Sequence, residues 1–146
     1  MPPSRLARRL LLSDAKGSPR MMSATKKKIL LVDDSSTALM IERMLLGSAT
    51  YDITTARDGR EAVARASAER FDLILMDVMM PNMTGIEACQ ALRALDETRE
   101  VPIILVTTRG ENENVERGFA SGCNDYVTKP INGVELLTKI RSQLGQ

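Results

Sequence analysis

The chain has 146 residues, of which 43% are apolar and 27% are charged, and its net charge is +1. This balance predicts one globular domain with a substantial core and gives no general electrostatic reason to bind nucleic acid or a membrane surface. The absence of histidine excludes Ser-His-Asp hydrolases, Cys-His proteases and histidine-ligated metal sites. Cys89 and Cys123 are too few for a secreted disulfide scaffold, so we expect reduced, packed thiols and a cytoplasmic protein.

The beginning of the chain differs from the rest in charge. Residues 1–28 contain eight basic residues and one acid, together with three prolines, and they show no sustained amphipathic period. This composition predicts a basic, disordered leader over residues 1–27 and a folded domain over residues 28–146. A basic arm that binds an acidic partner is the alternative interpretation. No apolar run approaches the length of a membrane span, so we expect none.

Short apolar runs predict five strands. Residues 29–32, 73–76 and 103–106 are runs of four apolar residues bounded by polar ones, which is typical of strands buried on both faces. Residues 51–55 alternate between apolar and polar, as expected of an edge strand, and residues 125–128 give a weaker fifth candidate.

Helical patterns fill the first intervals between these runs. Residues 36–46 are predicted to form one helix, and residues 60–69, which are rich in alanine, a second. The third opens on Thr84-Gly85-Ile86-Glu87, a capping-box pattern. The first helix places Ala38, Ile41, Met44 and Leu45 on one face. For the third, the predicted inward residues are Ile86, Cys89 and Leu92.

Two more helices complete the alternation. Val115 and Phe119 lie four residues apart in the fourth, and the fifth begins near Asn132. The fifth repeats apolar residues every three or four positions, namely Val134, Leu137, Ile140 and Leu144. Five strands alternating with five helices predict an α/β domain whose parallel sheet is covered on both faces.

Polar side chains stand where the predicted strands end. Asp33 and Asp34 follow the first strand, Asp77 follows the third, Thr107 follows the fourth, and Lys129 follows the fifth. In an open parallel sheet, functional groups collect beyond the carboxyl ends of the strands. If the first and third strands are neighbours, their ends lie about 5 Å apart, and the three carboxylates share one small pocket.

Such a pocket has a definite chemistry. Clustered carboxylates raise one another's pKa unless a cation compensates, and all-oxygen ligands suit a hard ion, Mg²⁺ before a softer metal. Acids, Mg²⁺ and a lysine fit phosphoryl transfer, with one carboxylate as the nucleophile. A cis Lys129-Pro130 peptide would aim the lysine at the pocket. Each residue also has a structural interpretation: Asp33 as a helix N-cap, Asp77 as a turn residue, Thr107 as a partner of a backbone group, and Lys129 as a solvated loop lysine.

These residues stand in motifs that resemble those of a known family. The motifs are Leu31-Val32-Asp33-Asp34, Leu75-Met76-Asp77-Val78-Met79-Met80-Pro81, Gly85, Val106-Thr107, and Tyr126-Val127-Thr128-Lys129-Pro130. In this order and spacing, residues 28–144 resemble the receiver domain of a two-component response regulator, the CheY-like family. The resemblance implies a flavodoxin-like (βα)5 fold, a doubly wound parallel five-stranded sheet of order 2-1-3-4-5. Because nothing follows the predicted fifth helix, we expect a stand-alone, single-domain regulator.

The resemblance also implies a role for each site residue. Asp77 resembles the phosphoacceptor, and Asp33 and Asp34 resemble the acidic pair that holds Mg²⁺ directly or through water. The backbone carbonyl of Met79 is implied as a further metal ligand, and Lys129 resembles the lysine that pairs with the phosphoryl group.

The same resemblance implies a switch. Thr107 resembles the hydroxyl that moves onto the phosphoryl group, and Tyr126 resembles the aromatic residue that turns inward when Thr107 moves; a buried core tyrosine is the alternative interpretation. Residues 108–121 are expected to shift with them. Met79 and Arg109 flank the pocket in this family, and because Met79 cannot act as a general base, we expect slow dephosphorylation.

The implied partners are proteins. A histidine kinase or a histidine phosphotransfer protein supplies the phosphoryl group, and a downstream protein binds the face of the fourth helix, fifth strand and fifth helix. We expect no direct nucleic-acid contact, because no recognition-helix unit is attached, and a monomer or weak dimer. The chain is expected to catalyse only its own phosphorylation and dephosphorylation, so it is not an enzyme in the usual sense.

Other functions are kept as alternatives. The chain fits a phosphorelay intermediate that passes the phosphoryl group onward, and a chemotaxis-type motility regulator. A Mg²⁺-dependent phosphatase with an aspartate nucleophile would use similar groups, but such enzymes usually carry a second Asp where this chain has Met79. A flavodoxin-like FMN carrier would need a Ser/Thr/Gly-rich phosphate loop where this chain has Asp33 and Asp34.

Overall fold

Five strands and five helices alternate along the chain in a computed structural model that describes residues 26–108 and 112–146. The elements are β1 (Lys27–Val32), α3 (Ser36–Leu46), β2 (Tyr51–Ala56), α4 (Gly59–Ala68), β3 (Leu73–Asp77), α5 (Gly85–Ala94), β4 (Ile103–Thr108), α6 (Asn112–Ser121), β5 (Asp125–Lys129) and α7 (Gly133–Leu144). Residues 1–25 of the predicted leader lie outside the described residues, and β1 begins at Lys27.

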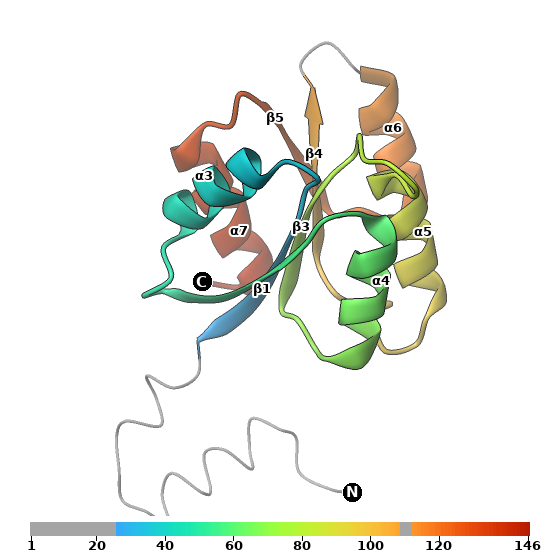
Figure 1. Ribbon diagram of the computed structural model, residues 1–146, viewed down its shortest axis with the longest axis horizontal. Coiled ribbons are helices and arrows are strands. Elements are labelled where there is room, and N and C mark those ends of the chain that lie inside the picture. The colour runs from blue at the N-terminus through green and yellow to red at the C-terminus, as the bar shows by residue number, and fades with distance from the viewer. Residues whose placement is uncertain (1–25, 109–111) are drawn as a thin grey trace, which may run out of the picture.

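The strands form one parallel sheet in the order β2-β1-β3-β4-β5. This confirms the predicted α/β class, the strand order 2-1-3-4-5 and the edge position of the alternating strand. Helices α3 and α7 cover one face of the sheet, and α4, α5 and α6 cover the other (Figure 1). Within the described residues, no helix is both long and apolar enough to cross a membrane.

Each central strand is buried on both faces, which explains its continuous apolar run. Alternate side chains enter opposite cores because the side-chain period of a strand is two. On β1, Ile29 and Leu31 pack toward α3 and α7, whereas Leu30 and Val32 pack toward the other helices. Cys89 and Cys123 are buried free thiols, as expected, and burial raises the pKa of Cys123 to about 12.

The capping prediction for α5 is confirmed. The Thr84 side chain accepts a hydrogen bond from the Glu87 N–H, and the Glu87 side chain accepts one from the Thr84 N–H. The three inward residues predicted for this helix, Ile86, Cys89 and Leu92, are all buried. Reciprocal capping satisfies two N–H groups that have no partner within the helix, so this helix begins where the sequence predicts.

The apolar face identified in the sequence of α3 is not the buried face of this helix. Ile41 is 48% exposed and Met44 is 76% exposed, whereas Leu39, Glu42 and Leu46 are buried; Ala38 and Leu45 are only partly buried. The buried residues recur at a helical spacing of three and four, but the middle one is a glutamate. A search for apolar periodicity rejects that stripe and selects the neighbouring one, because it counts a charged residue against burial.

One member of the apolar repeat noted for α7, Val134, does not face the core. The buried residues of this helix are Leu136 and Ile140, and Val134 is 78% exposed. Val134 precedes Leu136 by two residues, which turns it by about 200° around a helix of 3.6 residues per turn. It therefore points away from the sheet, while Leu137 and Leu144 are packed against the edge of the core.

Candidate functional site

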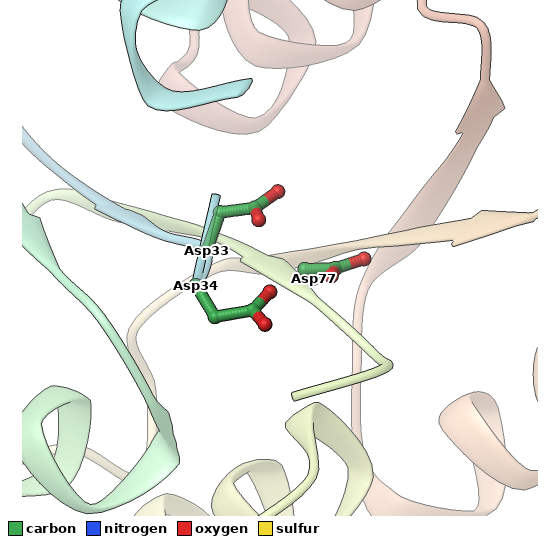
Figure 2. A group of neighbouring side chains, drawn as sticks. All are labelled: Asp33, Asp34 and Asp77. Atoms are coloured by element: carbon green, nitrogen blue, oxygen red, sulfur yellow. The ribbon is translucent and has the colours of Figure 1, made fainter. Parts of the chain in front are cut away.

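Side chains from the carboxyl ends of the strands meet at one edge of the sheet. Asp33 follows β1 directly, Asp77 is the last residue of β3, and Lys129 is the last residue of β5. One carboxylate oxygen from each of Asp33, Asp34 and Asp77 lies within 4.8 Å of the others, and Figure 2 shows the three carboxyl groups gathered together. The structure thus brings together acids that are separated by more than 40 residues in the sequence.

Lys129 is the cation placed among these acids. Its Nζ lies 3.3 Å from Oδ2 of Asp33, to which it donates a hydrogen bond, and 3.5 Å from Oδ1 of Asp77. The Lys129-Pro130 peptide is cis, as the sequence analysis suggested. The interpretation of Lys129 as a solvated loop lysine is therefore wrong, because its ammonium group is engaged by two carboxylates.

The charge on Asp77 is costly. Burial raises its pKa to about 6, with the charges of Asp33 and Asp34 acting in the same direction and Lys129 opposing them. Burial lowers the pKa of Lys129, but the charges of Asp77 and Asp33 outweigh it, and the pKa is raised overall. The site therefore carries an excess of negative charge that a bound cation would relieve.

The hydrogen bonds also test the structural interpretations of Asp33, as a helix N-cap, and of Thr107, as a partner of a backbone group. Ser35, and not Asp33, is the N-cap of α3; Asp33 Oδ1 accepts a hydrogen bond from the Ser35 N–H at 2.9 Å. Thr107 is 1% exposed, and its hydroxyl has no hydrogen-bond partner among the described residues. It therefore does not satisfy a backbone group, and a buried hydroxyl in this state is available to a ligand.

Tyr126 joins three elements beside the site. Its ring stands edge-on to that of Phe119 in α6, with centroids 6.0 Å apart, and Nζ of Lys139 in α7 lies 4.8 Å from the ring centroid. Tyr126 is half-buried and Phe119 is 47% exposed. Arg109, the other flanking residue considered above, lies outside the described residues.

One residue of the site, Glu42, was not predicted from the sequence. It lies on the inner face of α3, is 1% exposed, and neither carboxylate oxygen has a hydrogen-bond partner among the described residues. Burial raises its pKa to about 8, with Asp33 and Asp77 acting in the same direction and Lys129 opposing them. The available signal was its position between Leu39 and Leu46 at helical spacing.

A glycine sets the position of Asp77. A Cβ atom on Gly85 would lie 2.2 Å from the Asp77 carbonyl oxygen, and the Gly85 N–H donates a hydrogen bond to the Val78 carbonyl at 2.9 Å. The first turn of α5 is thus pressed against the end of β3, where any larger residue collides with backbone.

We expect Gly85→Ala to destabilise the fold by about 2 kcal/mol or more, because the new methyl group overpacks this contact. Urea unfolding measures the change. Gly145→Ala is the matched control: Gly145 has φ +72° with nothing within 4 Å of an added Cβ, so its cost is only the backbone strain of about 1 kcal/mol. Equal stability losses would contradict the collision.

Comparison with known proteins fits this geometry. The family described as response regulator receiver domain matches residues 29–141. This chain belongs to that family. The transcriptional regulatory protein ResD of Bacillus subtilis is 38% identical over 124 residues, which cover 85% of this chain and 50% of ResD. The chain therefore spans about half the length of the curated relative it matches.

Two solved receiver domains are similar in structure. One is the receiver domain of sensor histidine kinase PA1611 from Pseudomonas aeruginosa, with a magnesium ion coordinated in the active site cleft; it is 34% identical, with a TM-score of 0.77, and the match covers 84% of this chain and all of that one. The other is the receiver domain of Ssk1 from Saccharomyces cerevisiae, solved with the histidine phosphotransfer protein Ypd1; that match is 29% identical, with a TM-score of 0.75, and covers 81% of this chain and 88% of that one.

Proposed function

We propose that the chain is a phosphoacceptor switch, in which Asp77 takes a phosphoryl group from a phosphohistidine on a partner protein. A carboxylate oxygen of Asp77 attacks the phosphorus in line, so a P–O bond forms as the P–N bond breaks, and the electron pair of the broken bond stays on the imidazole. Lys129 is placed to neutralise charge on the phosphoryl oxygens. The observation that carries this proposal is a buried acceptor carboxylate held against a lysine and a second buried acid.

The residues present fit Mg²⁺. They offer oxygen ligands only, their carboxylates converge within 4.8 Å, and one of them, Asp34, is exposed, which leaves room for the waters that Mg²⁺ retains. We propose that Asp33, Asp34, Asp77 and the backbone carbonyl of Met79 would hold the ion. When bound, it supplies positive charge that offsets the negative charge on the carboxylates and the transferring phosphoryl group.

The output we propose is a change of protein affinity. A phosphoryl group on Asp77 adds nearly two negative charges. Asp77 pairs with Val106 across the sheet, so the next residue of β4, Thr107, places its unpartnered hydroxyl beside the end of β3 as a hydrogen-bond donor. In this proposal Tyr126 responds to the movement of Thr107, and its ring contacts Phe119 of α6 and Lys139 of α7. The face of α6, β5 and α7 would then bind a downstream protein differently in the two states.

Incubation with Mg²⁺ and acetyl phosphate, and separately with Mg²⁺ and a small phosphomonoester, tests this function against its alternatives. A switch forms one acyl phosphate per chain and releases little product, whereas a phosphatase turns over small phosphomonoesters continuously. A phosphorelay intermediate would also pass the label to a histidine phosphotransfer protein. We propose the switch, acting in the cytoplasm and not as a turnover enzyme, in keeping with the buried free thiols. Continuous phosphomonoester hydrolysis would overturn it.

A protein donor is supported by an exposed apolar stripe beside the site. This α3 stripe consists of Met40, Ile41 and Met44, which are all exposed, on a helix that starts two residues after Asp34. Contiguous exposed apolar patches are typical of surfaces that bind another protein. We assign the α3 stripe to the phosphohistidine-bearing partner, since a donor must approach Asp77 from this edge of the sheet.

We expect Met44→Glu to slow phosphoryl transfer from a phosphohistidine protein about tenfold, because a charge in the centre of an apolar contact is costly. Acetyl phosphate serves as the matched control, since it needs no docking surface; its rate should change less than about twofold. Label transfer from a purified donor that phosphorylates the wild-type chain measures the first rate. Equal slowing with both donors would show that the site itself is disturbed and would contradict the assignment.

A further inference from the structure

Glu42 is a buried acid that the proposed phosphoryl transfer does not use. Its carboxylate is almost completely enclosed and unpartnered among the described residues, although it lies in a helix that could have held an apolar residue there. A buried carboxyl group without a hydrogen bond is unfavourable, because it has lost its water and gained no other partner. We therefore expect the Glu42 carboxyl group to gain a hydrogen-bonding side chain in another state of the protein.

The direction of Glu42 identifies that partner. Helix α3 covers the face of the sheet that receives the side chains of Leu31, Leu75 and Val127. Asp33, Asp77 and Lys129 each stand two residues further along their strands, so by the two-residue period they point to the same face. Burial lowers the pKa of Lys129, whereas the charges of Asp77, Asp33 and, to a smaller extent, Glu42 raise it. Burial raises the pKa of Glu42, and the charge of Lys129 opposes that shift.

Lys129 is held loosely in this structure. Its distances of 3.3 and 3.5 Å to Asp33 and Asp77 exceed the roughly 2.7–2.9 Å of a strong charge-assisted hydrogen bond. The two carboxylates that hold it also belong to the acidic group that would bind a divalent cation. A cation bound by these carboxylates repels the ammonium group and competes with it for their oxygens, which favours movement of Lys129 to another acceptor.

We propose that Glu42 is a positioning residue, which receives the Lys129 ammonium group when a divalent cation occupies the three aspartates. Lys129 is then paired and retained beside the site, within reach of an incoming phosphoryl group. This inference rests on the proposed function. It predicts that Glu42 favours cation binding by acting through Lys129 and not by attracting the cation directly.

Isothermal titration with Mg²⁺ on four forms of the chain tests this coupling. Glu42→Gln should weaken Mg²⁺ binding about fivefold, because a neutral amide oxygen holds the displaced ammonium group less strongly than a carboxylate does. Lys129→Met should tighten Mg²⁺ binding by removing the competing charge. In the Lys129→Met background, Glu42→Gln should change the affinity less than about 1.5-fold. Equal weakening in both backgrounds would mean direct attraction of the cation and would overturn the proposal.

A crystal structure of the wild-type chain with Mg²⁺ provides a second test that needs no variant. We expect Nζ of Lys129 within hydrogen-bond distance of a Glu42 carboxylate oxygen; an ammonium group still on Asp33, or turned into solvent, would overturn the proposal. The two failures are distinguishable. A chain that binds Mg²⁺ and accepts phosphoryl groups but shows no coupling defeats this inference alone, whereas a chain that binds no Mg²⁺ defeats it together with the proposed metal site.

Discussion

Asp77→Asn is expected to lose phosphoryl acceptance almost entirely, with the rate from acetyl phosphate falling roughly 1000-fold or more, as for removal of a covalent nucleophile. An amide oxygen carries no negative charge and is a poor nucleophile toward phosphorus. Asp33 lies close to Asp77, but one of its oxygens is engaged by the Ser35 N–H and the other by Lys129. Acceptance is measured as incorporated radiolabel per chain.

The fold of this variant should be retained. Burial raises the pKa of Asp77 to about 6, so its charge costs stability at neutral pH and a neutral amide of similar shape should leave stability equal or higher. Asp96→Asn is the matched control, at an exposed surface position paired with Arg99, and should accept label at the wild-type rate. Label uptake by Asp77→Asn at the rate of this control would contradict the assignment of the acceptor.

The second large effect is a pH dependence of stability that originates in Glu42. Burial raises the pKa of this carboxyl group from 4.5 to about 8, so between these values the folded chain binds more protons than the unfolded chain. Stability is therefore greatest at low pH within this window and falls as the pH rises. From pH 5 to pH 8 the loss due to Glu42 is roughly 3 kcal/mol, and Asp77 adds roughly 1 kcal/mol of the same sign.

Glu42→Gln should remove most of this slope, because glutamine does not ionise. The free energy of unfolding is measured by urea titration in EDTA at several pH values, so that no divalent cation compensates the acids. At pH 8 the variant should be more stable than the wild type by roughly 3 kcal/mol. Glu100→Gln, at an exposed position, is the control and should leave the slope unchanged. A Glu42→Gln curve that runs parallel to the wild type would contradict the raised pKa of Glu42.

The strands and the strand-end residues could be predicted from the sequence because both depend on local patterns. A strand buried on both faces is a continuous apolar run, and the polar residue that ends it stands at the sheet edge, so Asp33, Asp77 and Lys129 were found without knowing their distances. Their convergence follows once the strand order places β1 beside β3. The capping box at Thr84 is equally local.

The faces of the helices at either side of the site were less predictable. On α3 an apolar stripe is exposed while Glu42 is buried. The burial of this glutamate is understood only from its position near Asp33 and Lys129, which are distant in the sequence. Apolar periodicity reports the average tendency of residue types to be buried. An exposed docking surface and a buried ionisable group both depart from that average. The departures on α3 therefore lie next to the site, where we assign donor docking to the outer stripe and lysine positioning to Glu42.

The most direct test of the central claim is to locate the covalent adduct. The chain is phosphorylated with acetyl phosphate and Mg²⁺, the acyl phosphate is reduced with borohydride, and the peptides are sequenced by mass spectrometry. We predict reduction of a single side chain, Asp77, to the corresponding alcohol. Modification at any other carboxylate, or a phosphoryl group found on a serine or threonine instead, would contradict it.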